Sequence, residues 1–181
     1  MSVPTIARPT AHQPDPAQLA GSADFVRVID GVDAPAVGPW EIGSGQRLGL
    51  STRGLRKREV PARVCGGTLT VTDDLLGSSF DFTLLVTDTG HHVDFCTRVT
   101  GLLSMDSWQA AGTATTAGGS SPVSLRLGYN GVFRQRGRHP SLWLAVTATV
   151  DIAGLGVAFG SRSTGRLKIR ADLNLGPGTA L

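Results

Sequence analysis

The chain has 181 residues and a mass of 18.8 kDa, with 40% hydrophobic residues, 17% charged residues and a net charge of +3. This composition excludes an intrinsically disordered chain, and the apolar runs are far shorter than the ~20 residues that a membrane-spanning helix needs. The N-terminus has prolines and polar residues where a secretory signal has its apolar segment, so we expect a cytoplasmic protein.

The N-terminal segment differs in texture from the rest of the chain. Residues 1–36 hold five of the ten prolines and show no clear periodicity, which predicts a flexible tail. The apolar patch at 25–29 leaves a docking strand open as the alternative. We expect one domain over residues 37–176, followed by a short C-terminal tail at 177–181.

From Pro39 onward, short apolar or alternating segments follow one another, separated by turn signals. A basic segment at 53–62 predicts a connector, with a helix as one option. No stretch of a dozen residues has a period of 3.6, so we expect an all-β antiparallel fold, and composition leaves both a barrel and a sandwich open. The predicted strands are 39–43, 47–52, 67–72, 79–87, 92–99, 107–115, 122–133, 141–152 and 165–175.

Four stretches of sequence resemble a known family. They are PWEIGSGQRLGL at 39–50, SFDFTLLVTDTG at 79–90, GTATTAGGSSPVSLRLGY at 112–129 and LAVTATVDIAGLG at 144–156. In these stretches the chain resembles the YceI-like family of lipocalin-like β-barrels. The resemblance implies a single antiparallel eight-stranded lipocalin-like barrel whose apolar lumen holds an isoprenoid-type or amphiphilic lipid. The chain departs from the family where the first strand runs into a His-Ser pair, because Gly45 and Gln46 stand there.

The strand faces agree in kind with this expectation. Residues two apart on a strand share a face, so the apolar sets of 80–86 and 125–127 predict faces that point into the barrel. We therefore expect a non-catalytic protein that binds a lipidic, isoprenoid-type ligand in its lumen. Two alternatives remain open: a structural or interaction barrel with a side-chain-filled core, and an enzyme using the same cavity. The predicted ligand-binding residues are Leu48, Leu50, Leu69, Val71, Phe80, Phe82, Leu84, Val86, Phe95, Trp108, Leu125, Leu127 and Leu144.

The sequence contains no nucleophile elbow and no phosphate-binding loop, so we expect no catalytic residues and no cofactor. Neighbouring residues of a strand point to opposite faces, and we therefore take His91 and His92 as surface histidines rather than metal ligands.

The basic runs at 53–58 and 134–139 are expected to be solvated, with weak contact to anionic membranes and no specific binding of nucleic acid. The three tryptophans, Trp40, Trp108 and Trp143, are expected to fill the core, and Cys65 and Cys96 to be small buried thiols. The sequence leaves the oligomeric state open.

Overall fold

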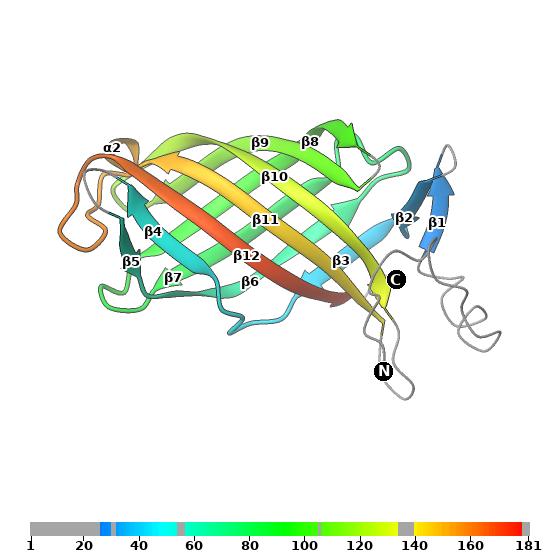
Figure 1. Cartoon of the computed structure of the whole chain (residues 1–181), viewed down its shortest axis with the longest axis horizontal. Helices are drawn as coiled ribbons and strands as arrows, with labels where there is room; N and C mark the ends of the chain where they lie inside the picture. Colours follow the sequence, from blue (N-terminus) through cyan, green and yellow to red (C-terminus); the bar gives the residue numbers. More distant parts are fainter. Residues whose placement is uncertain (1–25, 30–31, 54–56, 105, 134–139, 179–181) are drawn as a thin grey trace.

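A computed structural model describes residues 26–29, 32–53, 57–104, 106–133 and 140–178. The described chain is mostly strand, with one short helix and with turns and loops between the strands (Figure 1). In chain order the elements are β1 (Val26–Ile29), β2 (Val32–Pro35), β3 (Gly38–Ile42), β4 (Gly49–Arg53), β5 (Arg58–Val60), β6 (Ala62–Val71), β7 (Ser79–Val86), β8 (His92–Ser104), β9 (Ser107–Thr116), β10 (Gly119–Phe133), β11 (Ser141–Asp151), α2 (Ile152–Leu155) and β12 (Arg166–Pro177).

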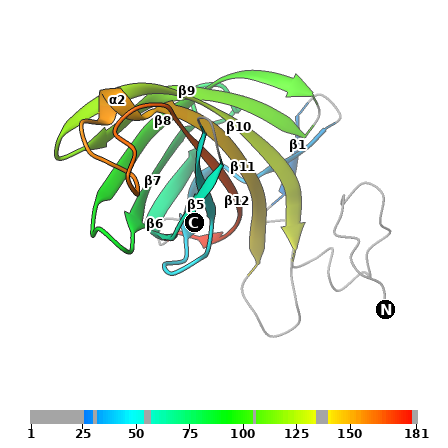
Figure 2. The same cartoon turned by 60° about the vertical axis from the view of Figure 1, so that its left-hand side comes forward.

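The strands β3 to β12 take eight places in a closed antiparallel ring (Figures 1 and 2). Ten strands fill eight places because two places each hold two strands. The first holds β3 and β4, which pair with different parts of β12. The second holds their partners β6 and β5, which are separated only by Pro61. Every other strand pairs with its neighbours in the chain, and the pairing of β11 with β12 closes the ring. This ring confirms the predicted all-β, antiparallel, eight-place architecture, and each predicted strand segment coincides with a strand.

Two glycines allow the sheet to bend sharply into the ring. A Cβ atom on Gly112 would lie 1.9 Å from the carbonyl oxygen of Cys96, and one on Gly67 would lie 2.4 Å from that of Asp81. Both glycines sit in strand interiors, β9 and β6, where glycine is the residue that permits such a close approach of neighbouring backbone. The glycine-rich composition thus serves the curvature of the strands as well as the turns between them.

The helix α2 and the loop after it close one end of the ring (Figure 1). The carboxylate of Asp151 caps the helix by accepting a hydrogen bond from the Ala153 N–H, and the helix ends at Gly156, whose φ of 69° lies in the left-handed region. Ile152, Leu155 and Phe159 are 0–1% exposed. These three apolar side chains seal the α2 end of the lumen.

The hairpin of β1 and β2 lies at the opposite end (Figure 1). Arg27 donates from Nε to the carbonyl oxygen of Pro35 (2.7 Å), and its two Nη atoms donate to the carbonyl oxygens of Thr72 and Asp73. Ala34 is completely buried, and the indole N–H of Trp40 donates to the carbonyl oxygen of Ala36. The hairpin is therefore attached to the ring by both hydrogen bonds and apolar contact.

Several sequence expectations need correction. The hairpin falls within the predicted tail at 1–36, of which residues 1–25, 30 and 31 lie outside the described part. Strand β1 at Val26–Ile29 confirms the alternative of a docking strand at 25–29. The predicted connector at 53–62 is strand at Arg53, at 58–60 and from Ala62 onward, and its residues 54–56 lie outside the described part. Strand β12 continues to Pro177, beyond the predicted domain end. Cys65 and Cys96 are exposed rather than buried, because both point outward from their strands.

Candidate functional site

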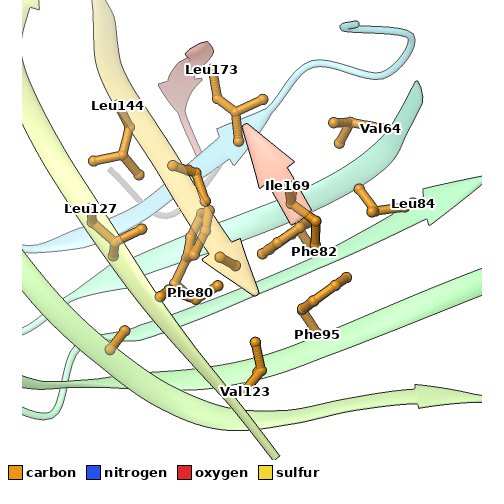
Figure 3. Packing of buried hydrophobic residues seen from close by; sticks show 14 of the residues in the cluster. Val64, Phe80, Phe82, Leu84, Phe95, Val123, Leu127, Leu144, Ile169 and Leu173 are labelled. Atoms are coloured by element: carbon orange, nitrogen blue, oxygen red, sulfur yellow. The ribbon is translucent and has the colours of Figure 1, made fainter. Parts of the chain in front are cut away.

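The predicted ligand-binding residues converge on the lumen, with one exception. Phe80, Phe82, Leu84, Phe95, Leu127 and Leu144 lie among the buried side chains that face one another inside the ring (Figure 3). Leu50, Leu69, Val71, Val86, Trp108 and Leu125 are also buried in this cluster, whereas Leu48 is only partly buried and packs at its edge. The alternation of buried and exposed residues along β7, β8 and β11 explains this convergence. Whether any of these residues contacts a ligand stays a prediction.

The middle of the lumen is filled by the protein's own side chains. The rings of Phe82 and Phe95 stack with centroids 4.4 Å apart, and Phe80 packs on Phe82 at 4.9 Å. Phe80, Leu84 and Leu127 expose 0% of their surface. A side chain beside a void wide enough for water would retain accessible surface, so these residues border no such void.

Trp40 and Trp108 follow the expectation of core packing, being 0% and 2% exposed. Trp143 does not, since 38% of its surface is exposed on the outer face of β11. The strand alternation explains the difference, because Leu142 and Leu144 on either side of Trp143 point into the lumen.

The wall of the ring has a seam where strands β3 and β4 meet β12. Strand β12 pairs with β4 as far as Arg170 and with β3 from Leu175 onward. Gln46 bridges the interval with its side chain: Nε2 donates to the carbonyl oxygen of Asn174 and Oε1 accepts from the Asn174 N–H, both at 2.8 Å. The amide side chain thus replaces a peptide group in the ladder.

A hollow of about 340 Å³ opens beside this seam. Its apolar lining includes Leu48, Val146 and Ala171, and its charged lining consists of Arg47, Arg170 and Asp172. Val146 is 1% exposed and faces the lumen from β11, so buried side chains of the core close the hollow on its inner side. A lining that combines apolar side chains with two arginines suits a molecule with an apolar part and an anionic part.

A second candidate lies beneath the β1–β2 hairpin. Tyr129 stacks on Trp108 with centroids 5.5 Å apart, and its buried hydroxyl has no hydrogen-bond partner among the described residues. Burial, followed by the nearby negative charge of Asp33, raises the pKa of the Tyr129 hydroxyl above its ordinary value of 10.0. Burial also raises the pKa of Asp33. A phenol whose pKa is raised stays protonated at neutral pH.

Replacing Tyr129 by Phe is expected to stabilise the protein by about 1 kcal/mol. The substitution keeps the ring against Trp108 and removes a buried hydroxyl that has no partner among the described residues, a group that costs about 1–3 kcal/mol. Urea unfolding of both proteins measures the change. A loss of stability would contradict the reading that this hydroxyl is unpaired in the folded protein.

Asp33 is expected to make stability depend on pH. Because its pKa is raised above 3.8 in the folded state, the folded protein binds the proton more tightly than the unfolded chain. The stability that protonated Asp33 contributes is therefore fully present below pH 3.8 and is lost as the pH rises through the raised pKa. Asp33→Asn should remove this decline. The unfolding free energy of the variant should change less with pH above pH 3.8, and the variant should be more stable than the wild type at neutral pH. An unchanged profile in the variant would contradict the assignment to Asp33.

His91 and His92 line a hollow of about 430 Å³ together with Gly90, Asp94 and Thr115. His92 is exposed, and the Asp94 carboxylate accepts a hydrogen bond from the Thr83 hydroxyl at 2.7 Å. Within the described ranges, no group of three or more His, Cys, Asp or Glu residues is arranged to hold a metal ion.

Sequence reasoning missed the seam. The departure at Gly45 and Gln46 was the available signal, since it marked a place where the chain does not follow the family pattern. It did not reveal that Gln46 would reach residue 174, because the two are separated by 128 positions in the chain.

Comparison with models of known protein families and with curated protein sequences gives no match for this chain. The resemblance to the YceI-like family therefore stays an expectation drawn from the quoted stretches. In the described part of the chain, no helix has the length and apolar character required to cross a membrane.

Proposed function

We propose that this is a non-catalytic binding protein for a lipidic, isoprenoid-type molecule with an anionic head group, held at the seam between β4 and β12. The observation that carries the proposal is the hollow of about 340 Å³ that is lined by apolar side chains and two arginines. This volume lies within the range of about 300–1,000 Å³ that is typical of small-molecule sites.

The apolar tail of the ligand would pack on the floor of the hollow. Leu48, which the sequence analysis included among the ligand-binding residues, lines this hollow with Val146 and Ala171. Burial of each methylene group contributes about 0.8 kcal/mol, so a short prenyl chain gains several kcal/mol without hydrogen bonds. Because the lumen is filled by side chains, the tail would stay in the hollow and would not enter the core.

The head group would lie between Arg47 and Arg170. The guanidinium group binds phosphate and carboxylate with two parallel hydrogen bonds, which makes arginine better suited than lysine to planar anion recognition. Asp172 also lines the hollow and would repel a second negative charge placed beside it. The chemistry of the rim thus favours one compact anionic group directed at the two arginines.

A structural or interaction barrel is the second candidate, and the filled lumen favours it. Phe80, Leu84 and Leu127 retain no exposed surface, as expected for a core stabilised by its own side chains. In this alternative the hollow holds only water and the wild-type protein retains no lipid.

Binding of farnesyl phosphate and farnesol to the purified protein distinguishes the two candidates. We expect the phosphate to bind more tightly than the alcohol, because only the phosphate pairs with the arginines. Arg47→Gln with Arg170→Gln should weaken binding of the phosphate by about 10- to 100-fold, as expected when charge-assisted hydrogen bonds are lost, and leave the alcohol nearly unchanged.

A control variant neutralises an arginine on strands that contribute nothing to the hollow. Arg98 is exposed on β8, and neither β8 nor its partners β7 and β9 line the hollow, so Arg98→Gln should bind farnesyl phosphate as the wild type does. No retention of either compound by the wild-type protein, measured by native mass spectrometry and isothermal titration, would overturn the lipid-binding proposal and leave the structural one.

A further inference from the structure

Six cationic side chains gather on the outer face around β4 and β12. The outward alternation of β12 presents Arg166, Lys168 and Arg170, while Arg53 lies on β4. Arg47 and Arg63 join them at the seam through an isolated antiparallel bridge. We call this set the basic wall: Arg47, Arg53, Arg63, Arg166, Lys168 and Arg170.

Two pairs within the basic wall place like charges directly opposite each other. Arg53 is the register partner of Arg166 in the β4–β12 ladder, and Arg47 is the partner of Arg63. Like charges at directly opposed positions of an antiparallel pair destabilise a sheet. Such an arrangement costs folding stability, and an external anion that binds across both strands would relieve it.

The carboxylates near the basic wall leave it positively charged. Among the described residues, the ion pair at this face joins Lys57 to Glu59, and neither belongs to the basic wall. Asp172 lies on β12 beside Arg170, and Asp151, the register partner of Arg166, accepts a hydrogen bond from the Ala153 N–H. These three carboxylates face six cations of the basic wall and Lys57.

An anionic bilayer fits this surface better than a nucleic acid does. No aromatic residue lies among the outward positions of β4 or β12, whereas binding of single-stranded nucleic acid relies on aromatic stacking. Trp143 is 38% exposed on the neighbouring β11, opposite Asn174, and tryptophan favours the interface between water and lipid. The apolar hollow at the seam opens among these same cations.

We infer that the basic wall docks the protein onto an anionic lipid bilayer, with Trp143 at the edge of the contact and the seam facing the membrane. Each arginine near a negatively charged leaflet contributes about fivefold to the partition coefficient, the equivalent of about 1 kcal/mol. The contact is electrostatic and weakens as the Debye length falls with rising salt. Docking does not require the proposed ligand, although it would bring the hollow to the surface where lipids reside.

Vesicle flotation with the full-length protein tests the docking. We expect binding to phosphatidylcholine vesicles that contain phosphatidylglycerol, little binding to pure phosphatidylcholine, and a loss of binding as salt rises. Arg53→Gln with Arg166→Gln should lower the partition coefficient about 30-fold, since two arginines are neutralised. The double variant should fold at least as stably as the wild type, because it removes an opposed pair of like charges.

The controls separate this inference from the proposed function. Arg53 and Arg166 do not line the hollow, so their double variant should still retain farnesyl phosphate. Arg98→Gln removes a charge from β8, which three strands separate from β12, and should keep the wild-type partition within about twofold, whereas Arg166→Gln alone should lower it about fivefold. Equal binding to both kinds of vesicle, an equal loss in Arg98→Gln and Arg166→Gln, or a preference for an oligonucleotide over the anionic vesicles would overturn the docking.

Discussion

Phe82→Ala is expected to destabilise the protein by about 3–5 kcal/mol, the usual cost of truncating a buried phenylalanine. Phe82 is 4% exposed and stacks on Phe95 with parallel rings at 4.4 Å, so its removal leaves a cavity that the closed ring cannot easily collapse. Denaturant unfolding at equilibrium measures the change. Retention of farnesyl phosphate by the folded fraction should persist, because Phe82 does not line the hollow at the seam.

Leu102→Ala provides the comparison for Phe82→Ala. Leu102 lies on β8, the strand that carries Phe95, but half of its surface is exposed. Its truncation should change the unfolding free energy by no more than about 0.5 kcal/mol. A small effect of Phe82→Ala, comparable with that of Leu102→Ala, would show that the lumen is already loosely packed and would favour a ligand inside it.

Gly112→Ala is expected to cost about 3 kcal/mol, at the upper end of the range for inserting atoms into a packed site. The new methyl group would lie 1.9 Å from the carbonyl oxygen of Cys96 and 2.8 Å from the Cα of Thr97. Both atoms belong to backbone of the neighbouring strand β8, which cannot move aside as a flexible side chain can. The two strands would have to separate, and thermal and urea unfolding measure the resulting loss.

Gly101→Ala is the matched control, since a Cβ atom on Gly101 meets nothing within 4 Å. Gly101 also lies in a strand of the ring, β8, so the two variants differ chiefly in the space around the new methyl group. We expect Gly101→Ala to be neutral or to stabilise the protein by a few tenths of a kcal/mol, because alanine restricts the unfolded chain. Equal effects of the two substitutions would contradict the role of Gly112 in bending the sheet.

The candidate site could be predicted only in part. Alternation along β7 and β10 identified Phe82, Leu84, Leu125 and Leu127 as inward residues, and they are buried. The hollow, however, lies where β4 and β12 approach the seam, and of the predicted ligand-binding residues it includes Leu48. Arg170 lines the hollow because β12 pairs with β4, and no local sequence pattern marks a pairing between such distant segments.

By itself, the sequence determined the all-β class, the positions of the strands and the faces that point inward, because the two-residue repeat and the turn residues are local properties of the chain. Only the tertiary structure decided that the lumen is filled and that Arg53 opposes Arg166. These features depend on the register between strands, and a shift of one residue would exchange the faces of a whole strand. The register follows from the closed ring as a whole, in which Gln46 completes the wall by hydrogen bonding to the backbone of Asn174.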